Sequence, residues 1–329
     1  MIRRPVPVAV ALAALTTLLF GTVGCAVPTA AAGPHIVVTT NILGDVVEEV
    51  LGDQATVTTL MRPDADPHSF ELSAQEAALL ERADLVVSNG LGLEAGLQQH
   101  LDRVAAEDTP LLEAGAVIEV LPYAEGDAAG TPDPHFWTDP ERMVDVVDAL
   151  EARAAEIPGI DAALLAENAE AYRAQLADLD AEMTSAFAQI PDDRRALVTN
   201  HHVFGYLADR FEFRVVGAVI PGGTTLAAPS AADLRDLTTA IESANVTTIF
   251  AESSQPDRLM QVLASEANID VRVVELFTES LTEPGQGAGT YLEMMRANTE
   301  RIATGLGADP TGTPDPTRTP DPTTEKERK

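Results

Sequence analysis

The fold of this chain is decided by residues 158–191, which read PGIDAALLAENAEAYRAQLADLDAEMTSAFAQIP. Asp161 is typical of a helix start, and Pro191 marks the end of the pattern. The stretch predicts one helix of about 30 residues, roughly 45 Å long, which can run along one whole side of a two-domain body. Its apolar side chains recur every three, four or seven residues, the spacing of one helix face, at Leu165, Tyr172, Leu176, Leu179, Met183, Phe187 and Ile190.

The residues before this helix alternate between short β-branched runs and longer stretches rich in Ala, Leu and Glu. This alternation is typical of a parallel sheet flanked by helices. The strand-like runs are 35–39, 55–60, 84–89 and 116–120. The helix-like stretches are 42–51, 73–82, 91–106 and 139–156.

The same alternation resumes after the long helix. Strand-like runs lie at 196–199, 214–220, 247–251 and 271–276, and helix-like stretches at 203–210, 230–243, 256–267 and 289–305. We therefore predict an α/β protein of two lobes, each with parallel strands flanked by helices, joined by one long rigid helix. A ligand site is expected in the cleft between the lobes. The predicted boundaries are 35–157 for the N-terminal lobe, 158–191 for the connecting helix and 192–306 for the C-terminal lobe.

The N-terminus has the features of an export signal. Arg3 and Arg4 precede a nearly unbroken apolar run at 8–20, which is too short to span a bilayer. Small residues then lead into Cys25, the only cysteine, as in a bacterial lipoprotein cleavage box. We expect a signal peptide at 1–24 and a lipidated tether at 25–34, which would anchor the protein outside the cell membrane.

An ordinary secretory signal, cut near residues 30–32, is the alternative. Thr22 stands where lipoprotein boxes usually carry Leu, which weakens the match. In either case a single cysteine allows no internal disulfide and no cysteine-rich zinc site.

The C-terminal residues 307–329 differ in composition from the rest of the chain. Thr-Pro-Asp-Pro occurs at 313–316 and again at 319–322, and such a composition builds no packed core. We expect a disordered tail there. Over the whole chain, 21 Lys and Arg face 52 Asp and Glu, a net charge of −31. This charge opposes binding to nucleic acid and attracts cations, although it is also compatible with solubility alone.

Two of the six histidines share a local context. His68 lies in Asp-Pro-His-Ser-Phe at 66–70, and His135 in Asp-Pro-His-Phe-Trp at 133–137. In both, proline sets an extended backbone before the imidazole. An acid two residues back could orient the ring through its second nitrogen, as at many metal sites. The repeat therefore marks both histidines as candidate metal ligands.

Two further candidates come from the second half of the chain. His201 follows the predicted strand 196–199, and Glu279 follows the predicted strand 271–276. Both belong to loops at the carboxyl ends of strands, where sites form in α/β lobes. Spacing alone leaves these two undecided between ligands and loop residues. Three imidazoles and one carboxylate would suit zinc, and a filled four-ligand shell argues against catalysis.

The remaining histidines are not expected to bind metal as first choices. His35 lies beside the tether, and His100 lies on a polar helix face. His202 neighbours a candidate, and we treat it as a second-choice ligand. Phe136 and Trp137 are expected to pack around the site and keep it dry.

The motifs together resemble the substrate-binding lipoproteins of zinc and manganese ABC importers, of the ZnuA/TroA-like, cluster A-I type. The resemblance covers about 35–306, nearly the whole mature chain. It rests on DPHSFE at 66–71, DPHFWTDP at 133–140, VTNHHVFGYL at 198–207 and LFTESL at 276–281, and on YLEMM at 291–295 with Asn298.

The resemblance implies a two-lobed metal-binding protein, not an enzyme, that delivers Zn²⁺ to an ABC permease and its ATPase. It makes His68, His135, His201 and Glu279 the metal ligands. Zinc members typically have histidine at the third position and manganese members glutamate, so His201 favours zinc. A monomer held at the membrane by its lipid anchor is expected.

Two departures from the family pattern accompany these implications. Aspartate usually stands where this chain has Glu279, which makes that residue the least secure of the ligands. Residues 123–134 contain acids but no histidine, so an auxiliary His-rich loop is not expected.

Three other interpretations remain open on sequence grounds: a manganese-binding member of the same family, a secreted zinc hydrolase, and a surface adhesin built on the same fold. The hydrolase would need an open coordination position and a general base. The sequence contains neither a His-Glu-x-x-His helix nor a Gly-x-Ser-x-Gly elbow.

Overall fold

The computed structural model describes residues 33–107, 109–124, 126, 128–220, 222–254 and 256–308. The predicted signal peptide 1–24, Cys25, and most of the tether and tail lie outside the described residues. Among the residues described, none of the helices is both long and apolar enough to cross a membrane.

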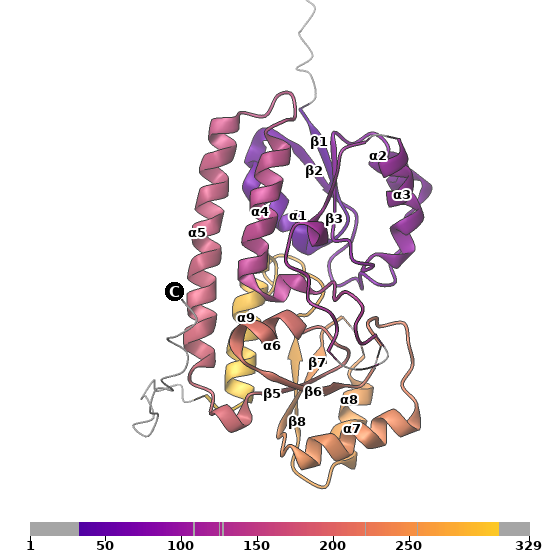
Figure 1. Ribbon diagram of the computed structural model, residues 1–329, viewed down its shortest axis with the longest axis vertical. Helices are drawn as coiled ribbons and strands as arrows, with labels where there is room; N and C mark the ends of the chain where they lie inside the picture. The colour runs from indigo at the N-terminus through magenta and orange to yellow at the C-terminus, as the bar shows by residue number, and fades with distance from the viewer. Residues whose placement is uncertain are drawn as a thin grey trace, which may run out of the picture. The chain divides into compact units, whose positions relative to one another are not determined.

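The first lobe is built on a parallel four-stranded sheet in the order β2-β1-β3-β4. Residues of β1 alternate between two cores, because successive side chains of a strand point to opposite faces. Ile36 and Val38 pack with α1 and α4, whereas Val37 packs with α2 and α3 (Figure 1). The strands are β1 (His35–Val38), β2 (Thr56–Thr59), β3 (Leu85–Ser88) and β4 (Leu111–Glu113). The helices are α1 (Asn41–Leu51), α2 (Ala74–Leu80), α3 (Gln98–Ala106) and α4 (Pro140–Ala154).

Helix α5 (Ala162–Phe187) joins the lobes and confirms the predicted connecting helix. Its 26 residues give a length of about 39 Å. The Asp161 side chain caps it by accepting hydrogen bonds from the backbone N–H groups of Ala163 and Leu164. The helix packs against α1 and α4 of the first lobe and against α9 of the second (Figure 1). Its buried stripe consists of Leu165, Ala169, Tyr172, Leu176, Leu179, Met183 and Phe187.

The second lobe contains two parallel strand pairs, with β5 lying beside β7. Their strands are β5 (Ala196–Thr199) with β6 (Arg214–Ala218) and β7 (Thr248–Glu252) with β8 (Arg272–Leu276). The helices are α6 (Gly205–Phe211), α7 (Ala231–Ser243), α8 (Arg258–Glu266) and α9 (Tyr291–Gly305). One continuous core contains side chains of both lobes and of α5. The predicted two-lobed α/β fold with a long connecting helix is thus confirmed.

Short 3-10 turns occur at five places in the described residues: η1 (Gly52–Gln54), η2 (Ala95–Leu97), η3 (Ala114–Ala116), η4 (Phe136–Thr138) and η5 (Asp192–Arg194).

The predicted strand at 116–120 is wrong. The edge strand is β4, whose buried Leu112 pairs with Val87 of β3. The chain turns directly afterwards, because Gly115 N donates to the carbonyl of Asn89. The β-branched residues Val117 and Val120 that suggested a strand are exposed.

Candidate metal centre

The four candidate ligands lie on four separate loops, two in each lobe. His68 follows β2, and His135 immediately precedes η4, which leads into α4. His201 comes two residues after β5, and Glu279 three residues after β8. All four are buried, with exposed fractions of 2 % or less. Parallel strands bring these loops to one place because their carboxyl ends meet at the same edge of each sheet.

The ligand atoms converge on one point. The Nε2 atoms of His68, His135 and His201 lie 2.9, 3.1 and 3.1 Å from Oε1 of Glu279. The Nε2 atoms of His68 and His135 are 3.4 Å apart, and one donor atom from each of the four residues lies within 4.8 Å of the others. A tetrahedral ion with metal–ligand distances of about 2.0–2.2 Å separates its ligands by roughly 3.3–3.6 Å. Small shifts are therefore enough to fit such an ion.

The orientation of His135 is set by Asp133. One oxygen of this carboxylate, Oδ1, accepts hydrogen bonds from both the backbone N–H (3.0 Å) and the ring Nδ1 (2.7 Å) of His135. A carboxylate only accepts, so Nδ1 carries the hydrogen and Nε2 turns its lone pair toward the cluster. Gly205 allows this approach, since a Cβ there would lie 2.5 Å from Oδ2 of Asp133.

The backbone beside His135 is held by a buried polar group. Asn89 donates its side-chain N–H to the carbonyl of Pro134 at 3.0 Å. The Glu94 carboxylate in turn accepts from the backbone N–H groups of Asn89 and Gly90 and from the hydroxyl of Thr39. The first lobe therefore holds this candidate ligand through a chain of hydrogen bonds.

His68 differs from His135 in how its acid is used, although both histidines follow Asp-Pro. Asp66 Oδ1 accepts from the backbone N–H of His68 at 2.8 Å. The ring Nδ1 of His68 has no hydrogen-bond partner among the residues described. The acid two residues back thus fixes the backbone at both histidines, and at His135 it also fixes the ring.

Glu252 is a site residue that sequence reasoning missed. It is the last residue of β7, is 2 % exposed, and places Oε2 at 3.3 Å from Nδ1 of His201, where the two make an ion pair without a hydrogen bond. Its backbone N–H donates to the side-chain oxygen of Asn200. The available signal was an acid that ends an otherwise apolar, buried strand, at the same carboxyl edge as the other candidates.

The charges of the cluster stabilise one another. Burial disfavours charge on His201, but the carboxylates of Glu279 and Glu252 outweigh it and raise its pKa well above the usual value. Burial likewise opposes the charge of Glu279, yet the three histidines hold its pKa well below the usual range. For Glu252, burial and the nearby Glu279 raise the pKa. The raised pKa of His201 favours its protonated form, so a cation that binds in the cluster competes with protons.

Aromatic side chains enclose one side of the cluster. The rings of Trp137 and His135 lie 5.3 Å apart between centroids. Trp137 Nε1 donates to the carbonyl of Thr278 (2.8 Å), next to Glu279 in the chain. The hydroxyl of Tyr291 donates to the carbonyl of Trp137 (2.7 Å). Trp137 is thus part of the wall around the cluster and also joins the two lobes.

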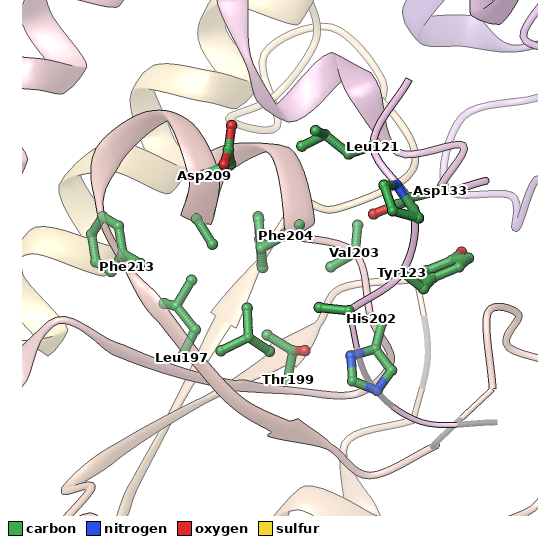
Figure 2. A pocket seen from close by; sticks show the side chains of 15 residues that line it. Leu121, Tyr123, Asp133, Leu197, Thr199, His202, Val203, Phe204, Asp209 and Phe213 are labelled. Atoms are coloured by element: carbon green, nitrogen blue, oxygen red, sulfur yellow. The ribbon is translucent and has the colours of Figure 1, made fainter. Parts of the chain in front are cut away.

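A cavity of about 470 Å³ lies beside the cluster, between residues 121–124 of the first lobe and β5 and α6 of the second. Tyr123, Asp133 and His202 lie on its wall (Figure 2). His202 is not among the four grouped residues. His35 lies in β1 with Nε2 at 2.9 Å from the Thr58 hydroxyl, and His100 lies on α3. The structure therefore groups the four first-choice ligands and leaves the other histidines outside.

Comparison with known proteins agrees with this fold. The family model ZnuA, described as zinc-uptake complex component A, periplasmic, matches residues 36–305. The chain belongs to this family, whose members are the metal-binding, substrate-binding components of ABC importers rather than enzymes.

Relatives of the chain have been assigned to both metals. The chain is 29% identical over 280 residues to the zinc-binding protein TroA of Treponema pallidum, covering 83% of this chain and 89% of the relative. It is 28% identical over 311 residues to the manganese ABC transporter substrate-binding lipoprotein PsaA of Streptococcus pneumoniae, covering 91% and 98%. The solved structure of periplasmic zinc-binding TroA superposes with a TM-score of 0.76 at 27% identity, covering 83% of this chain and 99% of TroA.

Proposed function

We propose that this protein captures Zn²⁺ outside the cell membrane and delivers it to an ABC importer, made of a permease and its ATPase. The observation that carries the proposal is the convergence of three imidazole nitrogens on one carboxylate oxygen, in a buried cluster formed by residues of both lobes. The proposed ligands are His68, His135, His201 and Glu279. Zinc accepts such a four-coordinate nitrogen and oxygen shell and makes no redox demand.

Manganese is the second candidate. Several relatives, PsaA among them, are named as manganese proteins. In this chain a further buried carboxylate, Glu252, lies beside His201 and adds oxygen to the surroundings of the site. Oxygen-rich shells suit manganese, but three nitrogen donors among the four nearest ligands favour zinc.

The arrangement along the chain is part of the proposal. Residues 35–157 and 192–306 form the two lobes, and 158–191 the connecting segment. Cys25 carries the lipid that anchors a monomer to the membrane, in keeping with relatives that are named lipoproteins. Labelling with a radioactive fatty acid should mark the wild type and not Cys25→Ser.

Metal competition on the chelated protein tests the choice of ion. We expect close to one zinc per chain by metal analysis, and calorimetry should show zinc displacing manganese. Equal affinity for the two ions would overturn zinc as the cargo while leaving metal capture intact.

Two histidine variants test the ligand set. His135→Ala should weaken zinc binding by more than about 100-fold, since loss of a direct ligand exceeds the effect of losing a residue behind one. His100→Ala, on α3 and outside the cluster, should match the wild type. Equal effects of His135→Ala and His100→Ala on zinc binding would refute the ligand set.

The fluorescence emission of Trp137, the only tryptophan, should change on zinc addition because its ring lies against His135.

A further inference from the structure

Residues 222–225, in the loop between β6 and α7, contact both segments of the first lobe that carry candidate ligands. The Thr225 hydroxyl donates to Oδ2 of Asp66 at 2.6 Å. The Tyr123 hydroxyl donates to the carbonyl of Gly223 at 3.0 Å. One short segment of the second lobe is therefore hydrogen-bonded to the first lobe at two places.

The Thr225 contact leads directly to His68. Asp66 accepts the Thr225 hydroxyl on Oδ2 and the backbone N–H of His68 on Oδ1. The carboxylate thus bridges the second lobe and the backbone of a candidate ligand. Hydrogen bonds to an ionised carboxylate are shorter and stronger than neutral ones.

Tyr123, which bonds to Gly223, also lies beside the ring of His135. The Tyr123 oxygen lies 3.3 Å from the ring Nδ1 of His135. Gly223 permits this packing, because a Cβ there would lie 2.8–2.9 Å from atoms of the Tyr123 ring. The Tyr123 ring also lines the cavity of about 470 Å³ beside the cluster (Figure 2).

We propose that Thr225 and Tyr123 are positioning residues that join the two lobes across the metal site and set how fast a bound ion leaves. The inference rests on the proposed function, since it presupposes that the clustered residues bind the ion. Ligands from both lobes hold the ion, so its release requires the lobes to separate, which breaks these two hydrogen bonds. Neither hydroxyl belongs to the proposed ligand set, and contacts of this kind act mainly on the dissociation rate.

The test measures zinc release from the purified, zinc-loaded full chain, by stopped flow with excess chromophoric chelator. Thr225→Val keeps the shape of the side chain and removes the donor, and it should speed release about tenfold, as expected for the loss of a hydrogen bond to a charged group. Thr225→Ser restores the hydroxyl and should release zinc at the wild-type rate. Tyr123→Phe should speed release about threefold, because its bond to Gly223 is neutral.

Thr224→Val is the matched control. The Thr224 hydroxyl accepts a hydrogen bond from Leu226 of its own loop at 3.3 Å, and we expect the wild-type release rate. One zinc per chain and an unchanged melting temperature without metal would show that each variant is folded. Equal release from Thr225→Val, Thr225→Ser and the wild type would overturn the inference while leaving zinc capture in place. A wild-type chain that binds no zinc would instead overturn the proposed function.

Discussion

At the scale of single residues, the three imidazole rings of the cluster differ in whether a second carboxylate lies behind the ring. Asp133 accepts a hydrogen bond from the ring of His135, and Glu252 lies at ion-pair distance from the ring of His201. The ring of His68 has no such partner among the described residues. A carboxylate behind a ligating imidazole fixes the ring and makes it a stronger donor to the metal. The affinity for metal should therefore depend on two acids that do not belong to the proposed ligand set.

The Glu252→Gln substitution tests this dependence. It keeps the size of the side chain and removes a buried negative charge beside His201. We expect zinc affinity to fall about tenfold, within the range for residues behind metal ligands. Competition titration against a chelator of known affinity measures the change. Glu266→Gln, an exposed residue of α8, serves as the control. Equal zinc affinity of Glu252→Gln and the control would show that Glu252 does not contribute to zinc binding.

At the scale of elements, α1 and α9 meet at a half-buried carboxylate. Asp45 of α1 accepts the backbone N–H of Tyr291, the first residue of α9, at 2.8 Å. The pKa of Asp45 is raised to about 6, chiefly by burial and also by the neighbouring acids Glu49, Glu48 and Glu293, against the lowering effect of the Tyr291 hydrogen bond. The folded state thus binds a proton at Asp45 more tightly than the unfolded chain does. This contact lowers stability when the carboxylate is ionised.

The sign of this effect gives a prediction for Asp45→Asn. Stability at this contact is greatest below about pH 4 and falls as pH rises toward 6, because the folded state must release the more tightly held proton. At pH 7.5 the neutral amide should raise the free energy of unfolding by about 1–3 kcal/mol. Near pH 3.5 the gain should vanish. Urea unfolding at both pH values checks this. The control Asp53→Asn, in the exposed turn after α1, should leave the free energy of unfolding unchanged at both pH values. A gain that persists at pH 3.5 would contradict the assignment.

At the scale of the whole molecule, the cluster takes two side chains from each lobe, so a bound ion joins them. Trp137 and Thr278 form one link between the lobes beside the cluster, and Asn41 of α1 forms another by donating to the Ser280 hydroxyl at 2.8 Å. The net charge of −31 attracts cations at long range and disfavours nucleic acid. Metal binding should therefore stabilise the entire two-lobed body.

Zinc should raise the melting temperature of the intact protein. At a free concentration 100 times the dissociation constant, an ion that binds only the folded state adds about 2.7 kcal/mol. For a chain of this size that corresponds to roughly 5–10 °C, and a chelator should reverse it. Calorimetry at pH 7.5 and pH 5 should show that zinc raises the melting temperature less at the lower pH. Protons compete with zinc there, because the carboxylates raise the pKa values of His135 and His201 against the opposing effect of burial. An equal rise at both values would contradict proton displacement.

The accuracy of sequence-based prediction depended on how local the relevant interactions are. The stripe of α5 and strand β5 follow from spacing within a few residues, and the structure has both where they were expected. Strand β4 and the start of α3 were misplaced. In the predicted helix 91–106, Leu91 adopts a positive φ of 55° between two glycines, and the turn there wraps around the buried carboxylate of Glu94. The same carboxylate accepts from Thr39, 55 residues earlier in the chain, and spacing alone does not reveal that contact.

The amino-acid sequence by itself determined the two α/β lobes, the helix between them and the repeated Asp-Pro-His segments, because each depends on periodicity or on neighbours along the chain. Only the tertiary structure decided that the two Asp-Pro-His segments use their acids differently: Asp133 accepts from both the backbone and the ring of His135, whereas Asp66 accepts from the backbone of His68 and from the Thr225 hydroxyl. Only the tertiary structure also placed Glu252 behind His201 and Thr225 against Asp66. The contacts of Glu252 and Thr225 join residues far apart in sequence. They exist because packing of the two lobes on α5 brings separate loops to one point, where a buried charge must find a partner.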